Sequence, residues 1–190
     1  MTSFSYTYRA RSSVGKSARS HALGNTQWIV VSMSSRQPTP RRHHVAIGVG
    51  QKLYIWGGEG DLLRIQPTSV QTFNVLLGTW ERPQQLHGSL PDSLYDVAYT
   101  SDGHIAYFFG GREGFLYNDT LYEIDLSTLN SRQLVPANPS CAPKITSGSR
   151  MVYYSQQLVL YGGSRGHDQH DGLHVFDLKT SELEGDLVER

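Results

Sequence analysis

Short apolar runs, each about five to seven residues long and separated by polar or glycine-containing turns, dominate the chain after residue 25. Their aromatic and β-branched residues are typical of β-strands, and no segment has the longer periodicity of an amphipathic helix. Asp102-Gly103, between two such runs, is a strong hairpin signal. The pattern predicts three sets of four strands: near 43–49, 52–56, 70–76 and 79–82; near 95–100, 104–109, 120–125 and 131–134; and near 149–154, 157–161, 172–177 and 182–188.

The second strand of each set ends in a pair of glycines. The pairs are Gly57-Gly58, Gly110-Gly111 and Gly162-Gly163, so the first glycines are 53 and 52 residues apart. Glycine adopts positive φ and lets another backbone come close, which predicts a buried strand that ends in a tight, crowded turn. A fixed period near 50 residues, with several strands in each period, is typical of a propeller or a similar array.

Further positions repeat in phase with the glycines. Asn74, Asp125 and Asp177 follow an apolar residue at intervals of 51 and 52, which is typical of a strand running into a turn closed by the side chain. Six residues later come Trp80, Ser131 and Leu183, and Trp28 lies 52 residues before Trp80. Four positions in phase indicate a true repeat.

The order of strand, Gly-Gly, apolar-Asp and tryptophan resembles the kelch repeat. The segment Thr39-Pro40-Arg41-Arg42-His43-His44 resembles the lead-in of that family, and the resemblance covers about 28–189. It implies an all-β, kelch-type β-propeller with four antiparallel strands in each blade. The second and third repeats depart from the family pattern, because they lack the lead-in Arg and His and the tryptophan.

The predicted organisation is a basic Ser/Arg-rich tail over 1–25, expected to be disordered, followed by a propeller segment over 26–190. The composition of the tail also fits a mitochondrial transit peptide. The propeller segment begins with one extra strand, over 26–32, which contains Trp28. Three repeats follow, at about 40–84, 90–135 and 141–190.

Three blades and one extra strand make about half of the six-bladed ring that is usual in the family. An open arc would expose an apolar blade face at each end. Three interpretations are open: a fragment of a longer propeller, a homodimer that completes a ring, and three blades that stand alone. The first is preferred.

Charge is balanced overall but unevenly spread. Residues 1–58 carry 8 Lys or Arg and no acid, whereas the remaining residues carry 17 acids and 9 bases. A net charge of zero argues against a dedicated nucleic-acid binder, and no apolar run is long enough to predict a membrane span. The single cysteine, Cys141, excludes a disulfide framework and favours a cytoplasmic or nuclear protein.

The sequence gives little support for a catalytic site. The densest set of potential metal ligands, His167 to His174, falls in the expected variable loop of the third blade and is interpreted as a polar loop. Asn118-Asp119-Thr120 matches the glycosylation pattern, but a turn is preferred. No hydrolase, zinc-protease, P-loop or dinucleotide motif occurs. We therefore expect no enzyme activity, no metal and no cofactor, although a few kelch-like propellers are copper radical oxidases.

The resemblance implies a module that binds a protein or peptide partner through loops on a rigid scaffold. Several kelch proteins are substrate receptors of cullin-RING ubiquitin ligases, so ligase components are candidate partners. A cytoskeletal or trafficking scaffold is the alternative. The candidate binding residues are Arg42, His44, Lys144, Arg150 and Arg165.

Overall fold

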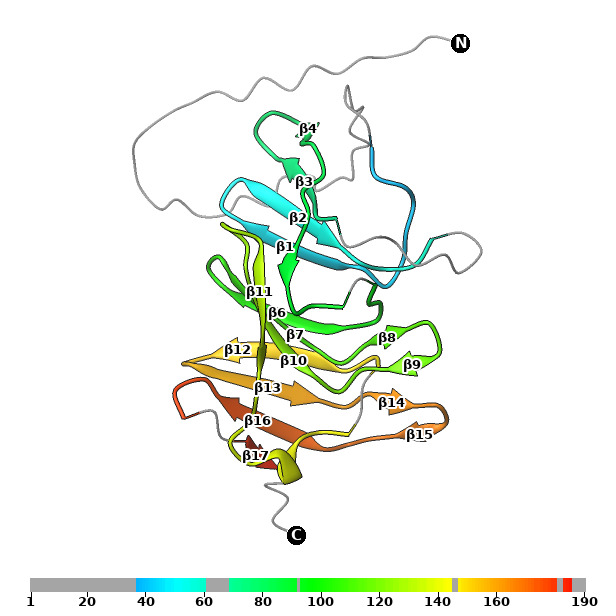
Figure 1. Ribbon diagram of the computed structural model, residues 1–190, viewed down its shortest axis with the longest axis vertical. Helices are drawn as coiled ribbons and strands as arrows, with labels where there is room; N and C mark the ends of the chain where they lie inside the picture. The colour runs from blue at the N-terminus through cyan, green and yellow to red at the C-terminus, as the bar shows by residue number, and fades with distance from the viewer. Residues whose placement is uncertain (1–36, 61–68, 92, 145–146, 181–182, 186–190) are drawn as a thin grey trace, which may run out of the picture.

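The computed structural model describes residues 37–60, 69–91, 93–144, 147–180 and 183–185. Within these ranges the chain forms three large sheets, which lie side by side in sequence order, and two short two-stranded sheets (Figure 1). They contain no α-helix, and one short 3-10 helix, η2, spans Pro139–Cys141. The predicted tail over 1–25 and the predicted extra strand with Trp28 lie outside the described residues.

The first sheet is the first predicted blade. It contains β1 (Val45–Val49), β2 (Lys52–Trp56), β3 (Gln71–Asn74) and β4 (Thr79–Trp80), paired in that order. Each strand is antiparallel to its neighbours. The short outer strand β4 places Trp80 against Phe73, with the ring centroids 5.1 Å apart.

The second sheet contains the four predicted strands and one that the sequence did not predict. The order β6 (Ala98–Asp102), β7 (Ile105–Phe109), β10 (Leu121–Asp125) and β11 (Asn130–Leu134) repeats the first blade. The added strand, β5 (His87–Gly88), pairs in parallel with β11. It was missed because two exposed residues carry no apolar pattern.

The third sheet contains β12 (Arg150–Tyr154), β13 (Gln157–Tyr161), β16 (Leu173–Asp177) and β17 (Leu183–Gly185). The three sheets share one register, because Val45↔Trp56, Ala98↔Phe109 and Arg150↔Tyr161 are equivalent pairs. This common register gives the strand residues of one blade counterparts in the other two.

The first strand of blades one and two starts later than predicted. The predicted starts at 43 and 95 were wrong, because His43 and Asp96 have φ of 55° and 57° and interrupt the extended backbone. Gly148, at the equivalent position of blade three, has φ of 76°. These three residues join the blades: Asp96 donates its N–H to the carbonyl of His43 (3.0 Å), and Gly148 donates to Asp96 (3.4 Å).

The core lies between the blades rather than within any one of them. One cluster joins blades one and two, with Trp56 and Phe108 packed at 5.5 Å between ring centroids. The second cluster joins blades two and three and includes Phe109, Met151 and Phe176. Each blade is therefore stabilised by its neighbour, as expected for a repeat array.

The glycine pairs have the backbone conformation that the sequence predicts, since all six residues have positive φ. A Cβ on Gly58 would lie 2.8 Å from the carbonyl oxygen of Arg42 and 2.8 Å from the Cβ of His44. A Cβ on Gly57 would lie 2.4 Å from the carbonyl oxygen of Leu94 in the next blade. Crowding by the lead-in and by the next blade explains why side chains are excluded here.

Candidate functional site

Corresponding hairpins follow the second strand of blades two and three. They are β8 (Arg112–Glu113) with β9 (Leu116–Tyr117), and β14 (Ser164–Arg165) with β15 (Asp168–Gln169). Both hairpins project on the same side of the sheets (Figure 1). We call this surface the hairpin face: the two hairpins together with the segments 41–44, 57–60, 93–96 and 147–149.

The lead-in segments anchor the base of the hairpin face in the same way in each blade. Isolated antiparallel bridges join Arg42 to Glu59, Tyr95 to Arg112, and Ser147 to Ser164. These pairs occupy equivalent positions, directly after the glycine pair and just before the first strand. The scaffold is therefore repeated, while the side chains that it presents differ from blade to blade.

Two arginines and two tyrosines form a layered stack across the two hairpins. The Arg112 guanidinium carbon lies 5.1 Å from the ring centroid of Tyr95 and 5.7 Å from that of Tyr117. Arg165, from the next hairpin, lies 5.8 Å from the Tyr117 ring. Within the described residues no carboxylate pairs with either arginine. Arg165 is exposed, whereas Arg112 is half-buried and its Nε is buried without a hydrogen-bond partner in the described part of the chain. Cation–π contacts of this kind fix the orientation of a guanidinium.

Hydrogen bonds hold the stack in place. The Tyr95 hydroxyl donates to the carbonyl of Gly114 at 2.8 Å. The backbone N–H of Gly166 donates to the Tyr117 hydroxyl at 2.7 Å, which ties the two hairpins together. The stack is thus held by hydrogen bonds within hairpin β8–β9 and between the two hairpins.

The tip of hairpin β8–β9 is apolar and open to solvent. Phe115 is 99% exposed and Leu116 is 73% exposed. The counterpart hairpin has His167 and Asp168 at these positions, and both turns contain a glycine with positive φ, Gly114 and Gly166. The hairpin therefore does not require apolar residues at its tip, and an exposed aromatic next to a charged stack is typical of a recognition surface.

In blade one, a buried carboxylate organises the lead-in. Glu59 is 5% exposed, and its Oε1 accepts from Arg42 Nε at 2.9 Å and lies 3.0 Å from His43 Nδ1. Arg41 donates to the carbonyl of Gly57 at 3.0 Å. Two of the four lead-in side chains thus contact one acid, which holds this corner of the hairpin face.

The structure brings only some of the predicted binding residues together. Arg42 and Arg165 lie on the hairpin face, and His44 packs against Gly58 at its base. Burial, followed by the charge of Arg41, lowers the pKa of His44, so its imidazole is neutral near pH 7. Lys144 is exposed in the segment between blades two and three. Arg150 donates to the carbonyls of Gly148 and Ser149 at the start of β12, which is a structural role.

A side-chain hydrogen bond on the hairpin face also links blades two and three. The Ser147 hydroxyl donates to the Asp96 carboxylate. Asp96 and Ser147 come from the lead-in segments of successive blades, so this contact closes the base of the face between them.

The segment His167 to His174 forms part of hairpin β14–β15 and of β16. In the described part of the chain, no group of three His, Cys, Asp or Glu side chains is placed to hold a metal ion. Asn118 accepts a hydrogen bond from the N–H of Thr120 at 2.7 Å, which forms the turn that the sequence favours at this site.

Sequence reasoning missed the residues that dominate the hairpin face: Tyr95, Arg112, Phe115, Tyr117 and Glu59. A usable signal existed for Glu59 and Arg112, since each stands directly after a glycine pair. No signal marked Phe115, because an aromatic residue in a strand-rich chain is normally assigned to the core.

The three sheets, with their common register and their shared glycine-pair ends, define a β-propeller segment built of repeated four-stranded blades. The chain belongs to the kelch-repeat family, since the family model described as the KLHDC2/KLHL20/DRC7 Kelch-repeats domain matches residues 20–185. Proteins of this kind act as modules for protein–protein interaction.

Three relatives illustrate the range of similar proteins. The chain is 27% identical over 163 residues to the Leucine-zipper-like transcriptional regulator 1 homolog of Drosophila melanogaster, covering 82% of this chain and 16% of that protein. It is 27% identical over 139 residues to Kelch domain-containing protein 10 of Homo sapiens, covering 71% of this chain and 31% of that protein. It is 25% identical over 139 residues to the Host cell factor of Drosophila melanogaster, covering 70% of this chain and 9% of that protein.

The chain therefore spans about a third or less of the length of these relatives. In the part of the chain that the structure describes, no helix has the length and apolar character needed to cross a membrane.

Proposed function

We propose that the hairpin face binds an acidic peptide segment that carries an apolar side chain next to its negative charge. The observation that carries this proposal is the stack of Arg112 and Arg165 on tyrosine rings, beside the exposed Phe115. The guanidinium groups supply charge and hydrogen-bond donors, and the hairpin tip supplies apolar contact area.

The arrangement of the site favours recognition over catalysis. The stack contains no nucleophile paired with a base, and a guanidinium group is suited to binding carboxylates rather than to transferring protons. Loops on a rigid scaffold are the usual place for binding residues. Arg42 extends the same surface in blade one, where its side chain is 66% exposed although its Nε is paired with Glu59.

The test is selection from a library of random displayed peptides on the immobilised 190-residue chain. We expect enrichment of peptides in which Asp, Glu or a terminal carboxylate lies next to an apolar residue. The decisive variant exchanges one hairpin tip for the other, Phe115→His with Leu116→Asp, because blade three already folds with those residues. Binding of enriched peptides should fall about tenfold or more, since a central aromatic anchor contributes about 2 kcal/mol.

The matched control is Val135→Asp, an exposed residue after β11 that is 65% exposed and outside the hairpin face. It should leave peptide binding unchanged. Equal binding by the tip-exchange variant and the unaltered chain would refute the proposed site.

A role as substrate receptor of a cullin-RING ubiquitin ligase is the more specific form of this proposal. It rests on family resemblance and on the presence of a peptide-binding surface. Such a receptor works in the cytoplasm or nucleus, and its ligand would be a degradation signal. We expect a cullin to co-purify with the chain in the presence of its adaptor, and to do so with the tip-exchange variant as well. A cytoskeletal or trafficking scaffold would purify without ligase components.

We also propose that a second copy of the chain covers the free faces of the arc. Blade three exposes Val152, Tyr161 and Leu173, at 57%, 57% and 41%. Their counterparts in blade one, Ile47, Trp56 and Val70, are at most 5% exposed because blade two covers them. A homodimer would place blade one of each copy on blade three of the other and complete a ring of six blades.

A further inference from the structure

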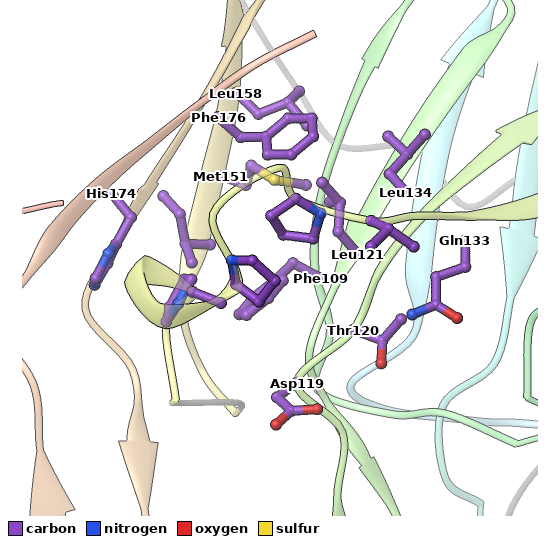
Figure 2. A pocket seen from close by; sticks show the side chains of 16 residues that line it. Phe109, Asp119, Thr120, Leu121, Gln133, Leu134, Met151, Leu158, His174 and Phe176 are labelled. Carbon is purple, nitrogen blue, oxygen red and sulfur yellow. The ribbon is translucent and has the colours of Figure 1, made fainter. Parts of the chain in front are cut away.

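A cavity of about 310 Å³ separates the outer parts of blades two and three. Its apolar wall comes from both blades and includes Phe109, Leu121, Met151, Leu160 and Phe176. Figure 2 shows Phe109, Leu121, Met151 and Phe176 with the turn of η2 beside them. A cavity of about 150 Å³ is large enough to hold benzene, so this one has room for a larger apolar group.

The equivalent space between blades one and two is filled. Only about 10 Å³ remains there, lined by residues that include Trp56 and Phe108. By register, Trp56 corresponds to Phe109, and Phe108 corresponds to Leu160. At both positions the interface between blades two and three has the smaller side chain. The cavity is therefore a specific property of the second interface and not of the fold.

Polar groups at the rim of the cavity have no partner among the described residues. Asp119 is exposed and makes no hydrogen bond or ion pair, and the same is true of the side-chain amide of Gln133. His174 Nδ1 is buried and also lacks a partner. In the picture, Asp119 and Gln133 lie below and to the right of the apolar side chains, and His174 lies across from them (Figure 2).

The blade-two side of the rim attracts a positive charge. The Asp119 carboxylate and the Gln133 amide oxygen both accept hydrogen bonds, and no Lys or Arg lines the cavity. A charged hydrogen bond to a carboxylate is stronger than a neutral one. An apolar body in the cavity with a donor at the rim would match both the wall and the acceptors.

We propose that this cavity binds a small molecule with an apolar body and a protonated amine, with the amine at Asp119. This site differs from the hairpin face, and its occupant does not depend on the identity of the peptide partner. Binding across the interface would also stabilise the contact between blades two and three.

The test uses tryptamine as the probe on the 190-residue chain, with isothermal titration calorimetry. Two analogues of similar shape serve as controls: 3-ethylindole, which lacks the amine, and indole-3-propionate, which carries a negative charge. We expect saturable binding of tryptamine, binding of 3-ethylindole about tenfold weaker, and the weakest binding for indole-3-propionate. Absence of saturable tryptamine binding, or equal binding of tryptamine and 3-ethylindole, would overturn the proposal.

The chain itself suggests the variants. Leu160→Phe introduces the residue that fills the equivalent space in the first interface, and should lower tryptamine affinity about tenfold or more while far-ultraviolet circular dichroism is unchanged. Asp119→Asn should remove the preference for tryptamine over 3-ethylindole and leave 3-ethylindole binding intact. Asp168→Asn is the charge control, because Asp168 is exposed and does not line the cavity.

If Leu160→Phe fails to fold, Asp119→Asn on the rim decides the question. Unchanged tryptamine affinity in a folded Leu160→Phe variant, or an unchanged preference in Asp119→Asn, would contradict the assignment.

Discussion

Asn74, Asp125 and Asp177 each close the turn after the third strand of a blade. The Oδ1 atom of each accepts a backbone N–H from two or three residues later: Leu77 at 3.0 Å, Ser127 at 2.8 Å and Lys179 at 2.8 Å. The sequence predicted this turn from the residue type and the spacing alone. The prediction succeeded because the interaction is local and needs no tertiary contact.

These hydrogen bonds give stability a dependence on pH. Bonds from Ser127 lower the pKa of Asp125, and bonds from Lys179 and Thr180 lower that of Asp177. A carboxyl group with a lowered pKa stabilises the folded state above the unfolded pKa, about 4, and loses this contribution as pH falls through the folded pKa. We expect the melting temperature to fall below about pH 4.

The double variant Asp125→Asn, Asp177→Asn keeps the acceptor oxygens but removes the titration. Thermal unfolding between pH 2 and 6 should show a shallower loss of stability at low pH than in the unaltered chain. An identical pH profile would mean that these two turns contribute nothing to acid sensitivity.

Among the elements, the sequence predicted all twelve blade strands, because the strands with apolar runs recur at a fixed period and the polar strand β11 (NSRQL) falls in phase with them. It missed β5, which is two residues long and pairs with the distant strand β11. It also missed the hairpins β8–β9 and β14–β15, whose two-residue strands are too short for an apolar pattern. The candidate site was likewise only partly predictable from the sequence. Arg42 and Arg165 were predicted from sequence as binding residues and lie on the hairpin face, whereas the stack around Tyr117 depends on how two hairpins meet.

The turn at Gly58 tests why the glycine pairs recur. Gly58→Ala places a Cβ 2.8 Å from a backbone oxygen at φ of 86°, so we expect a loss of about 2 to 4 kcal/mol in the free energy of unfolding. Gly48→Ala is the matched control in β1, where φ is not positive and no atom lies within 4 Å. It should change stability by less than about 0.5 kcal/mol.

Chemical denaturation of both variants measures the difference. Equal stability of Gly58→Ala and Gly48→Ala would show that the glycine pair is not required by crowding.

In the whole molecule, the blades formed by the described residues end in two faces that the repeat normally buries. Phe109 in blade two is 6% exposed, whereas its counterpart Tyr161 in blade three is 57% exposed. At the other end, Leu53, Ile55 and Phe73 are half-buried, while their counterparts Ala106, Phe108 and Ile124 are at most 2% exposed. The sequence predicted such faces from the number of repeats, but only the register identifies the residues on them.

The proposed dimer requires that the exposed face of blade three, with Val152 and Tyr161, be an inter-blade surface. Light scattering of the 190-residue chain across a range of concentrations distinguishes a dimer from a monomer. We expect a mass that rises from 21.2 kDa towards twice that value, and that stays at 21.2 kDa when Val152→Lys and Tyr161→Lys are combined. A monodisperse mass of 21.2 kDa for the unaltered chain at every concentration would contradict it.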